Sequence, residues 1–189
     1  VTGDPTPVFD PIDGEYSAVR IFAYALSGAG AMNGDGRRDV LVGSRHPIGF
    51  GEAYLLFDLP AGGSEPILDL LARGGGVRVV REQRWGFLGD MVAEAGDFNG
   101  DGLADALVGV PGGGRDTHGE TFLIFGSSEL GDSVTELDLL EPGPWRVRFL
   151  GEFPYDWSGS SLAGLGDVNG DGYDDIGIMG TDLRNRDST

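Results

Sequence analysis

The ten residues GDVNGDGYDD, at positions 166–175, contain four aspartates, one asparagine and three glycines. Aspartates this close raise one another's free energy by charge repulsion, and glycine loses more backbone entropy on ordering than any other residue. Some feature of the folded protein must offset both effects. The nature of that feature determines how the rest of the chain is interpreted.

The same nine-residue pattern occurs three times at a nearly even spacing. Residues 97–105 read DFNGDGLAD and residues 167–175 read DVNGDGYDD, while residues 31–39 read AMNGDGRRD and lack the leading aspartate. We call these the first (31–39), second (97–105) and third (167–175) loops and number their residues as positions 1 to 9. An apolar run follows each loop: VLVG, ALVG or IGIMG. Recurrence of this kind indicates three structural repeats.

Short apolar runs within each repeat predict strands. They are about four to six residues long, are rich in Val, Ile, Leu, Phe and Tyr, and end at Gly, Pro, Asn or Asp. A full repeat has four of them: one before the loop, one after it, one in GEAYLLF (51–57) or GETFLIF (119–125), and one at 77–80 or 145–149. No window keeps a helical period over three turns, so we expect helix only as a short turn, near 68–72 or 134–140.

Hydrophobic patterning indicates how these strands pack. The strand after each loop is apolar at successive positions, as expected when protein covers both of its faces. The outer strand alternates instead, with arginines on one side as in RVRF at 146–149, which is typical of a strand with one wet face. Four-stranded units that are buried inside and solvated outside predict the blades of a β-propeller. The expected fold is therefore all-β, with blades of four antiparallel strands.

The repeats are expected to form one domain with an uneven number of strands. This domain covers residues 1–189 and contains repeats at about 17–76, 77–144 and 145–189. The last repeat ends after the strand at 176–179 and lacks two outer strands, and at most one additional strand is expected around 17–22. Exposed blade faces and strand edges favour pairing with other chains. We therefore expect either a fragment of a larger propeller or a homo-oligomer.

Charge and composition exclude several classes of partner and site. The chain has 31 acidic and 13 basic residues, a net charge of −18, which repels nucleic acids and anionic membrane surfaces. It contains no cysteine, so disulfides and thiolate metal sites are excluded. No apolar stretch approaches the length of a membrane span. We expect no nucleic-acid partner and no membrane insertion.

A bound calcium ion would offset the crowded charge of the loops. Calcium takes six or more hard oxygen ligands, and each loop presents oxygens at alternate positions, with a glycine where the chain must bend sharply. The expected ligands are Asp97, Asn99, Asp101, the carbonyl of Leu103 and Asp105 in the second loop, and Asp167, Asn169, Asp171, the carbonyl of Tyr173 and Asp175 in the third. In the first loop Ala31 replaces the leading carboxylate and two arginines follow, so a site formed by Asn33, Asp35, Arg37 and Asp39 is expected to be weak or empty.

Two other interpretations of the loops explain less. A helix-loop-helix calcium site would need a bidentate glutamate at the twelfth residue, where the chain has Val108 or Ile178 within an apolar strand. A hairpin turn without metal would account for the Asn-Gly and Asp-Gly dipeptides. It would not account for the carboxylates that cluster around those dipeptides. We therefore expect calcium in a hairpin loop, at two sites.

The repeated pattern resembles the FG-GAP repeats of integrin α-subunit propellers and of many bacterial surface and secreted proteins. The resemblance rests on GDVNGDG with its ninth-position Asp175, on the apolar strand that follows, and on the downstream Gly-x-x-Tyr/Phe strand, and it covers about 17–180. It implies structural calcium on one rim of a propeller and ligands on the opposite face. The family's propellers typically have seven blades, so three loops do not close such a ring. The Phe-Gly element is retained only loosely, at residues 85–87.

Reactive groups are sparse, which favours a binding function. The two histidines, His46 and His118, lie in Gly- and Pro-rich connections, and neither a nucleophile elbow nor a phosphate loop is present. Trp85, Trp145 and Trp157 are expected to be wedges between blades, with a sugar-stacking platform as the alternative. We expect a noncatalytic, calcium-stabilised module of a cell-surface or secreted protein that recognises protein or glycan. The alternative is an accessory propeller domain of a polysaccharide- or lipid-acting enzyme.

Overall fold

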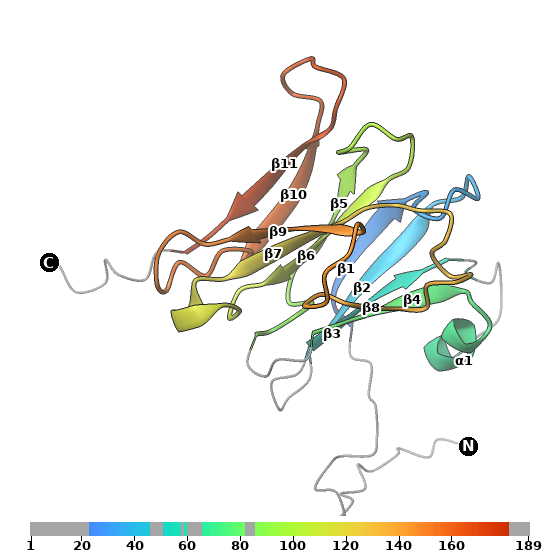
Figure 1. Ribbon diagram of the computed structural model, residues 1–189, viewed down its shortest axis with the longest axis horizontal. Coiled ribbons are helices and arrows are strands. Elements are labelled where there is room, and N and C mark those ends of the chain that lie inside the picture. Colours follow the sequence, from blue (N-terminus) through green and yellow to red (C-terminus); the bar gives the residue numbers. More distant parts are fainter. Residues whose placement is uncertain (1–22, 46–50, 58, 60–65, 82–85, 182–189) are drawn as a thin grey trace, which may run out of the picture.

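The computed structural model describes residues 23–45, 51–57, 59, 66–81 and 86–181, and these residues are almost entirely strands and turns (Figure 1). The strands form three sheets, which we call blades 1, 2 and 3. Blade 1 contains β1 (Ala23–Gly30), β2 (Asp39–Arg45), β3 (Gly51–Leu56), β4 (Gly76–Val80) and β8 (Glu136–Asp138). Blade 2 contains β5 (Val92–Gly96), β6 (Asp105–Val110), β7 (Glu120–Ile124) and β9 (Arg146–Leu150). Blade 3 contains β10 (Ser161–Gly166) and β11 (Asp175–Met179).

This topology confirms the all-β, blade-type fold. Neighbouring strands pair in sequence order and antiparallel within each blade, except that β8 runs parallel to β4 at the edge of blade 1. Each loop joins the first two strands of its blade, and blade 3 has two strands in the described part of the chain. The sheets and the sequence repeats divide at different points. Strand β4 begins the repeat expected at 77–144, yet it hydrogen-bonds with β3.

The two expected helical turns have different outcomes. Helix α1 (Ile67–Ala72) confirms the turn near 68–72. The prediction of a helical turn near 134–140 is wrong, because this segment contains strand β8, which pairs with β4 of blade 1. The strand expected around 17–22 lies outside the described residues. Within them, β1 is the strand that precedes the first loop.

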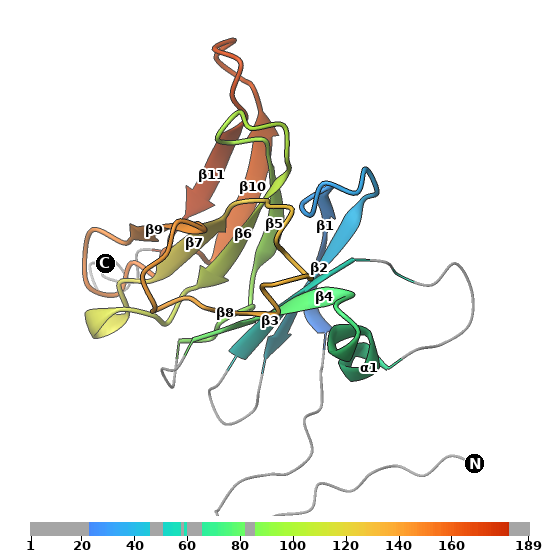
Figure 2. The same cartoon turned by 45° about the vertical axis from the view of Figure 1, so that its right-hand side comes forward.

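The blades pack face to face through two apolar cores. The core between blades 1 and 2 includes Leu41, Leu55, Val108 and Phe122, all without solvent exposure. The core between blades 2 and 3 is smaller and is centred on Leu107 and Leu123. Every residue of β6 is buried, as predicted from its uninterrupted apolar run, because blades lie on both of its faces. In Figure 2 the three sheets stand side by side in chain order.

Close backbone contacts repeat at the two junctions between blades. A Cβ on Gly43 of β2 would lie 1.9 Å from the Gly89 carbonyl oxygen, and a Cβ on Gly109 of β6 would lie 2.4 Å from that of Gly159. Only glycine permits this approach. Trp157, one of the expected wedges, is half-buried and stacks on Phe87 with ring centroids 6.2 Å apart. Its backbone N–H donates to the carbonyl of Thr117 in blade 2, so it lies between blades 2 and 3.

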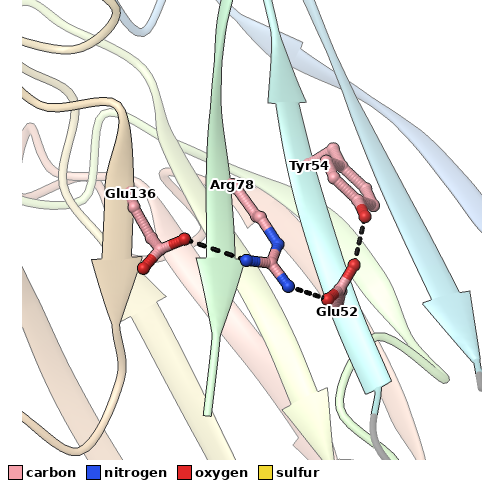
Figure 3. Close-up of polar contacts among 4 residues, drawn as sticks. All are labelled: Glu52, Tyr54, Arg78 and Glu136. Atoms are coloured by element: carbon pink, nitrogen blue, oxygen red, sulfur yellow. Dashed lines mark hydrogen bonds and ion pairs between the residues drawn. The ribbon is translucent and has the colours of Figure 1, made fainter. Parts of the chain in front are cut away.

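Polar side chains hold β8 at the outer edge of blade 1 (Figure 3). The guanidinium of Arg78 on β4 donates to Glu136 of β8 at 3.0 Å and also to Glu52 of β3, which accepts from the hydroxyl of Tyr54 as well. The hydrogen bond to Glu52 raises the pKa of Arg78 further. Arg78 therefore links three strands, one of which comes from the connection between β7 and β9.

A buried ion pair joins blade 1 to blade 2. Arg81, which follows β4, places Nη2 3.0 Å from Oε2 of Glu120 on β7, and their side chains are 2% and 0% exposed. Arg148 on β9 contacts the other oxygen of Glu120. Burial lowers the pKa of Arg81, and the charge of Glu120 opposes that effect. Removing one partner of such a pair leaves an uncompensated buried charge. This pair therefore fixes the blades relative to each other.

Candidate metal centre

The backbone of all three loops depends on glycines in the left-handed region. The residue before position 1 is Gly30, Gly96 or Gly166, with φ of 64°, 73° and 68°, and a register shift occurs there in each blade. The glycines at positions 4 and 6 also have positive φ in every loop. Residues with a Cβ adopt this conformation at a cost of about 1–2 kcal/mol. The recurring glycines are therefore explained by the turn itself.

Side-chain oxygens of the second loop gather around the backbone N–H groups of the turn. Asp97 accepts from the N–H of Asp101 through Oδ1 and from that of Gly102 through Oδ2, both at 3.0 Å. Asn99 Oδ1 accepts from the same Asp101 N–H at 3.0 Å, and its Nδ2 donates to Asp101 Oδ2 at 2.8 Å. Asp101 Oδ1 accepts from the N–H of Leu103 at 2.9 Å. The side chains at positions 1, 3 and 5 thus lie together around the turn, with Asn99 and Asp101 exposed and Asp97 half-buried.

The third loop repeats this network. Asp167 accepts from the N–H groups of Asp171 at 3.1 Å and Gly172 at 2.9 Å, and Asn169 Nδ2 donates to Asp171 Oδ2 at 3.1 Å. Hydrogen bonds, that from Gly172 first, hold the pKa of Asp167 below its usual value. Donors that favour the charged form keep the carboxylate ionised to lower pH. The leading aspartate is therefore a preorganised anion.

The ninth position lies at the base of the loop in all three repeats. Asp39, Asp105 and Asp175 accept from the N–H of position 2, at 2.7, 2.9 and 3.0 Å respectively. Asp105 also accepts from the N–H of Gly126, which follows β7, at 2.9 Å. This aspartate therefore ties the loop to its own blade.

Burial of Asp105 perturbs its titration. Loss of solvent raises its pKa from 3.8 to about 6, against the opposing effect of its backbone donors. The folded state therefore binds this proton more tightly than the unfolded state. On account of Asp105, the free energy of unfolding falls as pH rises between 3.8 and about 6. At neutral pH the charged form is held at the expense of stability, which a nearby cation would offset.

The donors of the second and third loops suit a hard cation. Carboxylate, amide and carbonyl oxygens are the ligands that calcium prefers, and an oxygen that accepts one N–H retains a second lone pair. The three carboxylates of a loop do not all converge. Within the described ranges no three Asp, Glu, His or Cys side chains are grouped so that they could hold a metal ion. The structure therefore shows an oxygen-rich turn rather than a closed coordination sphere.

The first loop has the same turn without the leading carboxylate. Asn33 Oδ1 accepts from the N–H of Asp35 at 3.1 Å, and Asp35 Oδ1 accepts from that of Arg37 at 2.7 Å, as at the same positions of the other loops. Arg38 forms an ion pair with Glu94 of blade 2 at 2.9 Å. Positive charge therefore lies where the third loop has Asp174.

Sequence reasoning missed the role of position 8. Asp174 of the third loop accepts from the N–H of Asp97 in the second loop at 2.8 Å through Oδ2. The three loops have arginine, alanine and aspartate at this position, so the repeat pattern gave no signal. Contact between the loops depends on how the blades stack, which is visible only in three dimensions.

The other residues considered for chemistry lie apart from the loops. His118 contacts the carbonyl of Arg115 within its own turn, and His46 and Trp85 lie outside the described residues. Trp145 lines a cleft of about 330 Å³ between β8 and β9, together with Leu137, Leu139 and three acidic residues. Trp157 is stacked on Phe87 between blades instead. The two described tryptophans therefore have different surroundings.

Known proteins match this chain over the region that contains the loops. The FG-GAP repeat family matches residues 93–123, which extend from β5 to β7 and include the second loop. Integrin alpha pat-2 of Caenorhabditis elegans is 32% identical over 155 residues, covering 78% of this chain and 12% of that protein. Integrin alpha-IIb of Mus musculus is 32% identical over 157 residues, covering 77% of this chain and 13% of that protein. The chain thus spans a small part of the relatives' length.

A human integrin α subunit also matches most of this chain. Integrin alpha-8 of Homo sapiens is 29% identical over 161 residues, which is 79% of this chain and 14% of that protein. In the part of the chain that the structure describes, every helix is too short to cross a membrane. The repeated loops, the stacked blades and these matches agree, and the chain belongs to the FG-GAP repeat family, with integrin α subunits among its relatives.

Proposed function

We propose that this chain is a noncatalytic, calcium-stabilised propeller module that recognises a protein ligand as part of a cell-surface or secreted protein. The carrying observation is the hydrogen-bond network that the second and third loops share. Asp97 and Asp167 each accept from the N–H groups of positions 5 and 6 of their own loops. Because the two loops are built alike and lie at the same end of adjacent blades, they support binding of the same ion, calcium, in both.

Calcium would act on folding in this proposal. When bound, it supplies positive charge that relieves repulsion among the carboxylates of a loop. The chain's own residues would shape the site. The side chains at positions 1 and 5 accept backbone N–H groups of the turn, and the aspartate at position 9 ties the turn to its blade. The expected ligands remain those at positions 1, 3, 5, 7 and 9 of the second and third loops. We expect weak affinity, as in the calcium sites of extracellular modules.

Recognition of a partner is supported by the relatives, which are integrin α subunits. We propose a protein partner first and a glycan as the alternative. The test is binding of the purified protein to arrays of extracellular proteins and of glycans, in calcium and in EDTA. Calcium-dependent binding to a defined protein supports the proposal. Binding only to glycans would change the ligand class, and binding to neither would contradict recognition as the function.

The outer faces of the array are proposed to contact further blades. Leu165 and Met179 are 51% and 60% exposed on blade 3, and Tyr24 and Leu26 are 58% and 69% exposed on blade 1. Exposed apolar surface of this kind marks interaction sites. The covering blades would come from a second copy or from further repeats of a longer protein. Mass measurement of the purified chain distinguishes these sources, because only self-association gives an oligomer.

A further inference from the structure

Two hydrogen bonds connect the second and third loops directly. The backbone N–H of Asp97 donates to Asp174 Oδ2 at 2.8 Å, and the N–H of Asp174 donates to the carbonyl of Asp97 at 3.2 Å. Gly96 makes room for this contact, because a Cβ there would lie 2.0 Å from Asp174 Oδ2. The backbone of Asp97 is therefore held on both sides by a residue of the next blade.

A ring contact reinforces the same junction. A Cβ on Gly100, position 4 of the second loop, would lie 2.5 Å from Cε1 of Tyr173. The side chain of Tyr173 thus covers the turn of the second loop, while its carbonyl is an expected ligand in the third. Ordering of the third loop therefore places two side chains against the second.

The junction between the first and second loops provides an internal comparison. The N–H of Ala104 donates to the carbonyl of Ala31 at 3.3 Å, just as the N–H of Asp174 donates to the carbonyl of Asp97. Leu103 lies over Gly34 as Tyr173 lies over Gly100. Ala104 has no carboxylate, however, and cannot accept from the N–H of position 1. The extra acceptor is thus a property of Asp174.

We propose that Asp174 is a positioning residue for calcium in the second loop and that it makes the second and third loops bind calcium cooperatively. This proposal rests on the proposed function. Asp174 fixes the backbone of Asp97, whose carboxylate is the leading ligand, without itself being a ligand. Calcium in the third loop orders the segment that carries Asp174, and coupling of this kind is reciprocal by thermodynamic necessity.

The test is calcium titration by calorimetry with single-loop variants of the full chain. Asp171→Ala leaves the second loop to bind alone, and Asp101→Ala leaves the third. We expect calcium affinity of the wild-type protein to exceed that calculated from the two single-loop variants by about fivefold or more. Asp174→Ala is expected to weaken the second loop by about tenfold, as loss of an outer-shell partner typically does. Measuring Asp174→Ala within the Asp171→Ala background isolates that loop.

Two matched variants separate positioning from charge. Asp174→Asn keeps an oxygen that can accept from the Asp97 N–H and is expected to retain most of the affinity. Asp132→Asn removes one charge at another exposed site and is expected to change nothing. If Asp174→Asn weakened binding as much as Asp174→Ala, the effect would be electrostatic and positioning would be overturned. Melting in EDTA checks that each variant folds.

The remaining outcomes separate this proposal from the proposed function. If the wild-type protein bound no calcium, both would be overturned. If both loops bound calcium and the wild-type curve equalled the sum of the single-loop curves, coupling alone would fail. Affinity of the second loop that was unchanged by Asp174→Ala would remove the positioning role while leaving calcium stabilisation intact.

Discussion

The first and second loops have the same turn but different chemistry. Both use Asn and Asp at positions 3 and 5 to accept backbone N–H groups, and both place a buried aspartate at position 9. Only the second has a carboxylate at position 1, Asp97, which accepts from the N–H of Gly102 and shares the N–H of Asp101 with Asn99. The comparison shows that the glycines and positions 3, 5 and 9 suffice to form the turn. The turn therefore forms without a carboxylate at position 1, and it is this carboxylate that we propose as the leading calcium ligand.

The largest effect is expected at position 9, which both loops share. Asp105→Ala would leave the N–H groups of Phe98 and Gly126 without their acceptor, at about 1–3 kcal/mol each, so we expect a loss of about 4 kcal/mol of unfolding free energy. Urea denaturation in EDTA measures it. Asp39→Ala should also destabilise strongly, since Asp39 accepts from Met32. Near-normal stability of Asp105→Ala in EDTA would show that position 9 serves the metal alone.

Substituting the glycines before position 1 measures the cost of backbone strain apart from the cost of a clash between blades. A Cβ on Gly30 would lie 2.3 Å from the Cβ of Ala104, whereas one on Gly166 would meet nothing within 4 Å. We expect Gly166→Ala to cost about 1 kcal/mol from positive φ alone, and Gly30→Ala about 3 kcal/mol because overpacking is added. Thermal unfolding of the two variants gives the difference. Equal losses would mean that the loops do not interlock across blades.

An effect of intermediate size is expected on the stabilisation by calcium, which should depend on the second and third loops and not on the first. At tenfold excess over the dissociation constant, one site stabilises the folded state by about 1.4 kcal/mol. We expect Asp101→Ala and Asp171→Ala each to remove part of the melting-temperature increase that calcium gives. Asp35→Ala, at the same position of the first loop, should leave that increase unchanged. An equal loss in Asp35→Ala, or an unchanged melting temperature of the wild-type protein in EDTA, would contradict the assignment.

The smallest effect is expected from restoring the missing carboxylate. Ala31→Asp gives the first loop the leading aspartate of the other two, although Arg37 and Arg38 still oppose a cation. We expect one additional weak calcium site and less than about 1 kcal/mol of added stabilisation at saturating calcium. Calorimetric stoichiometry would detect the site. Replacing both arginines as well should strengthen it, and no gain in that triple variant would argue that position 1 is not the decisive difference.

The sequence predicted local structure well where a repeat supplied the signal. The loops, the strands beside them and the fully buried β6 follow from patterns within about ten residues of one another. Strand β8 was missed because it is three residues long and pairs with β4, whose Arg78 lies 58 residues before Glu136, and no local pattern specifies such a pairing. Asp174 was missed for the same reason. Its partner Asp97 lies 77 residues away in sequence and meets it only when blades stack.

The parallel strand β8 also bears on how the chain is made. Strand β4 emerges from the ribosome well before its edge partner, since Arg78 and Glu136 are 58 residues apart. At about 5–20 residues per second, the edge stays open for several seconds during translation. An unpaired edge is a template for aggregation. A message truncated within the second blade would therefore yield a product with an adhesive edge, and not simply a shorter version of the protein.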